Sequence, residues 1–149
     1  MALLNIRKAP DEVLNKKCKT VVSFDGRLHI LLDDMYETMK NASGLGLAAP
    51  QVGILKRVAV VDIDDKRIEL INPEIIARSG NSEALDEGCL SFPGQAVKVK
   101  RPKGVTVRAQ DRNGKEFTVS GQDLMARALC HEIDHTNGIV FTKRGEEGF

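Results

Sequence analysis

Near its C-terminal end the chain reads Cys130-His131-Glu132-Ile133-Asp134-His135. The two histidines are four residues apart, so on a helix they lie on one face and their imidazoles can bind the same ion. Glu132 is one position further along, about 100° round the helix axis, and is close enough to act on a water molecule at that ion. The stretch therefore predicts a helix that carries a metal site.

We expect this motif helix to span about residues 121–136, with Ser120 as its N-terminal cap and Asp123 completing a capping box. The spacing i, i+4, i+7, i+11 predicts one buried face, made of Leu124, Ala128, His131 and His135. Two buried imidazoles need hydrogen-bonding partners, and a metal ion provides for both. The alternative is a pair of core histidines that are bonded to carbonyl groups.

Two histidines do not complete a catalytic site, which usually has three protein ligands and one open position. No histidine follows His135, and Glu146 and Glu147 lie in a short charged tail that is a poor platform for a ligand. We therefore expect the third ligand upstream. The candidates are the three cysteines of the chain, Cys18, Cys89 and Cys130.

Cys89 is the favoured candidate because its surroundings predict a rigid, extended segment. Gly88 permits close approach of the backbone, and Pro93-Gly94 marks a turn. Cys130 points about 100° away from His131 on the helix and is interpreted as a core thiol. Cys18 lies among lysines with no motif around it. A Cys89 thiolate would complete a Cys-His-His site.

A glycine-rich segment, residues 44–53, has small side chains that leave its backbone bare. Such a strand can pair with an extended peptide through main-chain hydrogen bonds. Gln51 is the one polar side chain in this segment. The alternative interpretation is a tightly packed buried strand in which Gln51 is hydrogen-bonded in place.

The remaining elements predict an α+β fold in one domain, residues 1–149. A helix at residues 25–41 has an apolar stripe of Leu28, Leu31, Leu32, Met35 and Met39, with His29 on its solvated face. Strands are predicted at residues 57–63, 67–71, 104–110 and 115–119, the last two joined by a turn at Asn113-Gly114. The basic run of residues 98–103 is interpreted as the solvated face of a strand.

The composition of the 149 residues is that of an ordinary globular protein, with 42% apolar and 29% charged residues. A net charge of +1 gives no indication of a nucleic-acid partner or of an acidic membrane surface. The start of the chain lacks the apolar core of a signal peptide, and no stretch approaches the roughly 18–20 apolar residues that span a bilayer. We expect a cytoplasmic protein without disulfides.

Three segments, in their order along the chain, resemble the peptide deformylase family. Residues 44–51 match G-x-G-L-A-A-x-Q, residues 87–91 match E-G-C-L-S, and residues 131–135 match H-E-x-x-H in the form H-E-x-D-H. Each motif alone is modest support, but three in order are highly specific. The resemblance extends over residues 6–141, nearly the whole chain.

The resemblance implies an α+β fold in which the motif helix is packed among antiparallel sheets. It implies removal of the formyl group from N-formylmethionyl peptides of nascent chains, near the ribosome, with release of formate. It implies one divalent metal ion, natively Fe²⁺ and replaceable by Zn²⁺, Ni²⁺ or Co²⁺. The implied metal ligands are Cys89, His131 and His135.

The other implied roles concern catalysis and substrate binding. Glu132 would be the general base and acid, and Gln51 and the backbone N–H of Leu90 would stabilise the oxyanion. Gly44, Leu45 and Gly46 would bind the substrate backbone. Candidates for the pocket of the methionine side chain are Leu45, Ala128 and Leu129.

The chain departs from the pattern of the family in two places. Cys130 stands where many relatives have Gln, and the chain ends soon after Phe141, whereas some relatives carry a long C-terminal helix. Two rival functions remain open at this point, a metallopeptidase and a binding module stapled by a metal. The Cys ligand and the lack of a downstream ligand disfavour the first, and three ligands instead of four disfavour the second.

Overall fold

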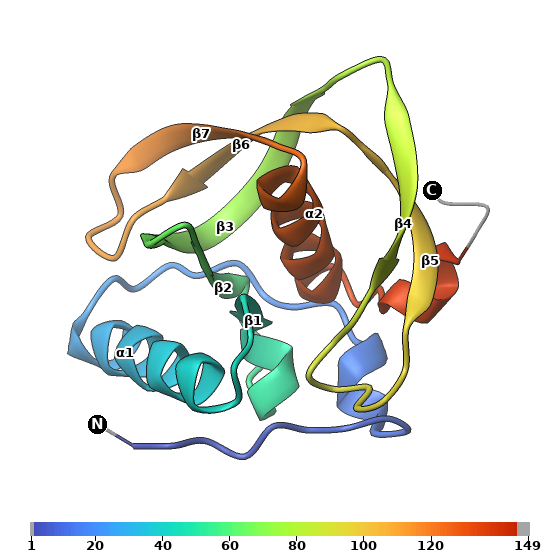
Figure 1. The fold of residues 1–149 in the computed structure, drawn as a ribbon. Helices are drawn as coiled ribbons and strands as arrows, with labels where there is room; N and C mark the ends of the chain where they lie inside the picture. The colour runs from blue at the N-terminus through green and yellow to red at the C-terminus, as the bar shows by residue number, and fades with distance from the viewer. Residues whose placement is uncertain (1, 146–149) are drawn as a thin grey trace.

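The structure is a computed structural model that describes residues 2–145, so the predicted tail residues Glu146 and Glu147 lie outside it. Within this range the chain forms two antiparallel sheets (Figure 1). The larger sheet has the order β1 (Gly46–Ala48), β2 (Val58–Ile63), β3 (Lys66–Arg78), β6 (Gly104–Gln110), β7 (Glu116–Gln122). The smaller sheet pairs β4 (Ser82–Glu87) with β5 (Val97–Pro102).

The motif helix, α2 (Leu124–Thr136), lies between these sheets (Figure 1). It contacts β1, β2, β3, β6 and β7 of the larger sheet and β5 of the smaller one. Ten of its thirteen residues are buried. The predicted α+β arrangement, with the motif helix packed among antiparallel sheets, is therefore confirmed.

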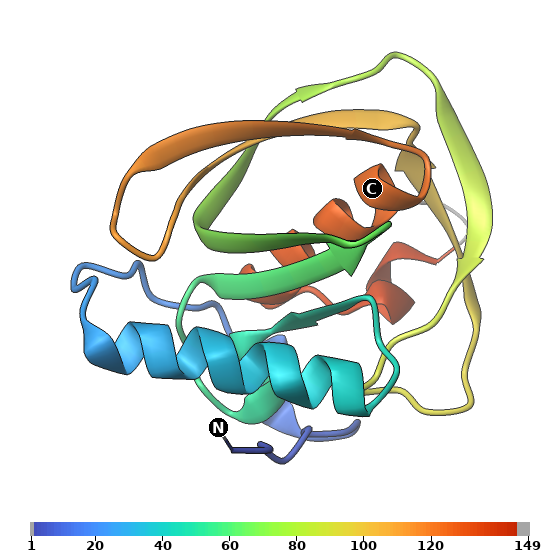
Figure 2. The same cartoon turned by 60° about the vertical axis from the view of Figure 1, so that its left-hand side comes forward.

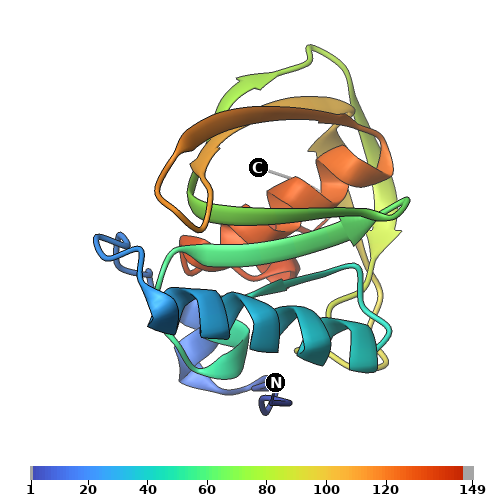
Figure 3. The ribbon, with the colours of Figure 1, turned by 90° about the vertical axis from the view of Figure 1, so that its left-hand side faces the viewer.

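The second helix, α1 (Gly26–Asn41), packs on the opposite face of β1 and β2 from α2 (Figures 2 and 3). Side chains of β2 alternate between the two helices: Val58 and Val60 join the cluster around α1, and Ala59 and Val61 join the cluster around α2. Because both of its faces are covered, β2 reads as an uninterrupted apolar run over its first four residues, Val58 to Val61.

Three expectations about the ends and length of elements were wrong. The motif helix begins at Leu124 instead of residue 121, because Gly121 and Gln122 pair with β6 as part of β7. Ser120 caps no helix: its hydroxyl contacts that of Thr106 on β6. The N-cap residue, Asp123, makes no capping hydrogen bond through its side chain. The competing β pairing therefore delays the start of the helix by about one turn.

The strand predicted at residues 67–71 continues as β3 to Arg78, past Asn72-Pro73. The register of β3 against β6 shifts between Ile71 and Glu74, and Asn72 has a positive φ of 52°. The missing N–H of Pro73 is tolerated at such a bulge. The Asn72 amide bonds the backbone of Val21 in both directions, which holds the bulge in place.

Two single residues also differ from their predicted environments. His29 is half-buried instead of solvated, and its Nε2 donates to the carbonyl oxygen of Arg112 at 2.8 Å. In the basic run, Lys98 and Lys100 are exposed as predicted, but Arg101 is 2% exposed. No helix within residues 2–145 has the length and apolar character needed to cross a membrane.

Candidate active site

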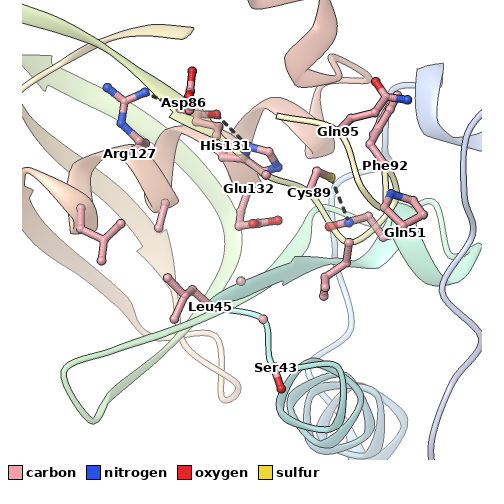
Figure 4. A pocket seen from close by; sticks show the side chains of 18 of the residues that line it. Ser43, Leu45, Gln51, Asp86, Cys89, Phe92, Gln95, Arg127, His131 and Glu132 are labelled. Carbon is pink, nitrogen blue, oxygen red and sulfur yellow. Dashed lines mark hydrogen bonds and ion pairs between the residues drawn. The ribbon is translucent and has the colours of Figure 1, made fainter. Parts of the chain in front are cut away.

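A pocket of about 520 Å³, the site pocket, opens beside α2. Its lining brings together all three motif segments (Figure 4). These are residues 43–46 with Gln51, residues 86–90, and five residues of α2, which are Leu124, Arg127, Ala128, His131 and Glu132. These segments are far apart in the sequence. The fold thus gathers most of the predicted site residues around one hollow.

Cys89, His131 and His135 each present a ligand atom to the same point, and these three atoms lie within 4.8 Å of one another. Sγ of Cys89 and Nε2 of His135 are 3.5 Å apart. Donor atoms around one tetrahedral ion with bonds of about 2.0–2.3 Å are separated by roughly 3.5 Å. The geometry of the cluster therefore fits a single ion. Burial, followed by the charge of His131, lowers the pKa of His135 and favours the neutral imidazole that binds metals.

The orientation of His131 is determined by Glu87, whose Oε1 lies 3.0 Å from Nδ1 of the ring. This contact leaves Nε2 free for a metal, the arrangement in which a carboxylate orients a ligating histidine. Burial alone would raise the pKa of Glu87, but hydrogen bonds from His131 and Arg101 outweigh it and lower the pKa to about 2. Glu87 is therefore a carboxylate at neutral pH.

Glu87 is held in turn by a buried ion-pair network that sequence analysis did not find. Arg101 donates to both of its oxygens, at 2.9 and 3.0 Å, and also to Asp134 at 2.6 Å. Arg127 donates to Oε2 of Glu87 at 2.7 Å. A signal was present: with a strand period of two, Arg101 shares the face of the buried Val99 instead of that of the lysines.

Glu132 is buried beside the cluster, and its Oε1 has no hydrogen-bond partner among the described residues. An unpartnered buried carboxylate oxygen is costly unless a group that the pocket admits, such as water, completes it. Burial raises the pKa of Glu132 to about 7. A carboxylate with such a pKa can both accept and return a proton near neutrality.

Gln51 lies on the other side of Cys89 from Glu132 (Figure 4). Its Oε1 accepts from the backbone N–H of Ala48, and its Nε2 donates to Oγ of Ser91 at 3.1 Å and contacts Sγ of Cys89 at 3.6 Å. The alternative interpretation of Gln51 as a buried, hydrogen-bonded residue thus describes its packing correctly. Gln51 nevertheless lines the pocket, so its amide is fixed within reach of a molecule bound there.

The strand β1 is an edge strand, since in the described part of the chain it pairs only with β2. Gly44, Leu45 and Gly46, at and just before its start, line the site pocket. The glycines are required by close packing: a Cβ on Gly44 would lie 2.7 Å from Leu90, and one on Gly46 would lie 2.5 Å from Glu132. The bare backbone predicted from the sequence therefore faces the pocket.

Two residues of α2 differ from expectation. Leu129 does not line the pocket: it is fully buried in the core against the larger sheet. Leu124, which was expected on the buried face, is 52% exposed at the rim of the pocket, because it is the first residue of the helix. Ala128 does line the pocket.

The other two cysteines, Cys130 and Cys18, do not belong to the cluster that Cys89 forms with the histidines. Cys130 belongs to the core cluster between α2 and the larger sheet, and burial raises the pKa of its thiol to about 11. Burial also raises the pKa of Cys18 to about 11. Neither residue lines the site pocket. Of the three candidates for a third ligand, Cys89 alone joins the histidines.

Comparison with known proteins decides the family. Residues 3–147 match the family described as polypeptide deformylase. The chain belongs to the peptide deformylase family. A peptide deformylase of Alkaliphilus metalliredigens is 56% identical over 144 residues, which cover 97% of each chain. A peptide deformylase of Acetivibrio thermocellus is also 56% identical, over 145 residues that cover 97% of this chain and 84% of the relative.

Solved structures agree with this assignment. The peptide deformylase from Thermotoga maritima has a TM-score of 0.95 and 38% identity, covering 98% of this chain and 99% of that one. The enzyme from Synechococcus elongatus, solved in complex with actinonin, has a TM-score of 0.93 and 41% identity, covering 96% and 79%. The protein of the present sequence is therefore a hydrolase that removes the N-formyl group from the N-terminal methionine of newly made chains. The rival functions are thereby set aside.

The close approach of Gly46 to Glu132 gives a direct test of the deformylase site. In Gly46→Ala, the added Cβ would lie 2.5 Å from Oε2 and 2.9 Å from Cδ of Glu132, so the carboxylate must move. On the expectation that Glu132 is the general base, turnover should fall about 100-fold at unchanged metal content, since displacement of such a group by about 1 Å has that effect. Steady-state formate release and metal analysis of the purified variant measure both quantities.

The matched control for Gly46→Ala is Gly80→Ala, because no atom lies within 4 Å of a Cβ built at Gly80. This control should retain the activity of the wild type. Full activity in Gly46→Ala would show that Glu132 does not depend on the space that this glycine leaves.

The ion-pair network behind His131 predicts a large cost for the loss of Arg101. Arg101→Met leaves the buried carboxylates of Glu87 and Asp134 without their shared partner, and we expect a loss of about 3–5 kcal/mol in the free energy of unfolding. Urea unfolding in the presence of a chelator measures it without a contribution from bound metal. Arg108→Met, which breaks an exposed pair with Glu74, is the control and should cost about 0.5 kcal/mol. Equal losses in the two variants would contradict the structural role of the network.

Proposed function

We propose that deformylation takes place at the cluster of Cys89, His131 and His135, which binds one divalent metal ion. The observation that carries this proposal is the convergence of three ligand atoms, an unpartnered carboxylate oxygen and an edge strand on one pocket. When bound, the ion would act as a Lewis acid on the formyl oxygen and make a water molecule more acidic. We propose Fe²⁺ as the native ion by resemblance to the family. A thiolate and two imidazoles also suit Zn²⁺, and Ni²⁺ or Co²⁺ would be accepted.

Glu132 is the proposed general base and acid. With its pKa near 7, it takes a proton from the attacking water and later passes that proton to the leaving amine of the methionine. The products are formate and a free N-terminus. Burial of Glu132 keeps bulk water away from the carboxylate during both transfers.

Gln51 and the backbone N–H of Leu90 are the proposed donors to the oxyanion that forms on the formyl oxygen. The support is that both residues line the pocket next to Cys89 in the sequence or in space, and that the Gln51 amide is held by Ala48 and Ser91. Donors that are already in place require no reorganisation as charge develops.

The substrate backbone is proposed to pair with Gly44, Leu45 and Gly46, so that the nascent chain extends the sheet at its free edge. The methionine side chain then enters the end of the pocket that Leu45 and Ala128 line. Since Leu129 lies in the core, it does not belong to this part of the proposal.

We also propose that the enzyme acts in the cytoplasm, on formylmethionyl chains as they emerge from the ribosome. The support is chemical, because formylated N-termini arise where translation starts. Co-sedimentation with translating ribosomes tests this, and absence from the ribosomal fraction at low and moderate salt would count against it.

The decisive experiment measures formate released from a formyl-Met-Ala-Ser peptide, with acetyl-Met-Ala-Ser and unmodified Met-Ala-Ser as controls. We expect release from the formyl peptide and no cleavage of the other two. Cleavage of the unmodified peptide would indicate a metallopeptidase, and metal binding without turnover would indicate a binding module.

A further inference from the structure

A second hollow, of about 300 Å³, lies behind the site pocket, between β4, β5 and the start of α2. Three residues line both spaces: Asp86, Leu124 and Arg127. These three residues therefore lie between the site pocket and the second hollow, and together they are called the wall.

Arg127 is the rigid part of the wall. Its Nη1 donates to Oε2 of Glu87 at 2.7 Å and to the carbonyl oxygen of Val99 at 2.9 Å, and its Nη2 donates to the carbonyl oxygen of Glu83 at 2.8 Å. The side chain is 11% exposed. Three hydrogen bonds to two strands hold the guanidinium against both of them, so an incoming apolar group cannot push it aside without breaking them.

The wall stands at one particular end of the pocket. Arg127 lies on the opposite side of His131 and Glu132 from Gln51 and Phe92 (Figure 4). In the proposed function, Gln51 meets the formyl group, so the side chain of the first residue extends the other way, toward Arg127. An unbranched side chain in this direction would point directly at the guanidinium group of Arg127.

We propose that Arg127 determines the specificity of this deformylase by limiting the length of the first side chain, and that the second hollow would admit longer apolar side chains if the wall were removed. This inference rests on the proposed direction of substrate binding. Leu85, Pro102 and Leu124 give the hollow an apolar surface to receive them, beside charged residues that also line it: Glu83, Asp86, Arg101, Lys103 and Asp123. Loss of Arg127 leaves Glu87 paired with Arg101 and His131, so the cluster keeps its support.

The test compares kcat/KM for two formyl peptides that differ in the first residue, methionine or the longer straight-chain 2-aminooctanoic acid. In the wild type methionine should be preferred. In Arg127→Ala we expect the ratio of the long substrate to methionine to rise at least about 10-fold, since each extra methylene that a pocket accommodates is worth about 10-fold or more. Metal content is measured alongside in every variant.

Arg127→Met is the matched control, because it keeps an unbranched side chain in the wall but removes the charge. Its substrate ratio should stay close to that of the wild type. A shift in Arg127→Met as large as in Arg127→Ala would overturn the inference, since the effect would then come from the guanidinium acting on Glu87.

Leu124→Ala removes another side chain of the same wall. Leu124 is 52% exposed and lies outside the ion-pair network, so this variant tests the inference even if Arg127→Ala does not fold. It should shift the ratio in the same direction by a smaller factor. An unchanged ratio in whichever of these two alanine variants is folded and metal-loaded would overturn the inference. Absence of formate release by the wild type would instead contradict the function itself, so the two failures are distinguishable.

Discussion

Glu132→Gln is expected to keep its metal and to release formate at least about 100-fold more slowly than the wild type. The amide has the size of the carboxylate but cannot accept a proton from water, and general acid–base catalysis contributes about 10²–10⁴-fold. Glu132 is not one of the three clustered ligands, so metal content should not change. Its Oε1 has no partner among the described residues, so the substitution breaks no hydrogen bond there.

The measurement pairs metal analysis with steady-state formate release at saturating formyl-Met-Ala-Ser. Glu116→Gln makes the same chemical change on β7, at a side chain that is 71% exposed, and should match the wild type in both. Near-normal turnover in metal-loaded Glu132→Gln would exclude Glu132 as the general base.

Cys89→Ala is expected to reduce the bound metal from one per chain to near zero after dialysis, with loss of measurable deformylation. The substitution removes the only thiolate of the cluster, and two imidazoles alone leave the ion without its charged ligand. The fold should remain, because Cys89 is a partly buried residue at the edge of a small apolar cluster.

The other two cysteines provide the controls within the same chain. Cys18→Ala and Cys130→Ala should each retain one metal per chain, because neither residue lines the pocket. Cys130→Ala is the sharper comparison, since this residue directly precedes His131 in the sequence. Stoichiometric metal in Cys89→Ala, or its loss in Cys130→Ala, would contradict the proposed ligand set.

Periodicity predicted the elements whose packing is one-sided or continuous. The apolar stripe of α1 and the alternation of buried and exposed side chains in β6 were predicted correctly, because each element buries one face. Prediction failed where pairing between strands determines the structure. The strand β4 is exposed at all but its last position, so it has no apolar pattern in the sequence. The strand β3 continues through an Asn-Pro pair that usually ends a strand. The start of α2 was misplaced because its first predicted residues pair with β6.

The sequence by itself determined the chemistry of this protein. The four-residue spacing of His131 and His135 places both on one helix face, and the order of three motifs identifies the family. The favoured thiol, Cys89, is the one that the fold brings to the histidines. Only the tertiary structure decided that Gly46 makes room for Glu132, and that Arg101 and Arg127 hold Glu87. These contacts join side chains that lie far apart in the chain, whereas helix spacing is local, and no local pattern records which distant residues meet.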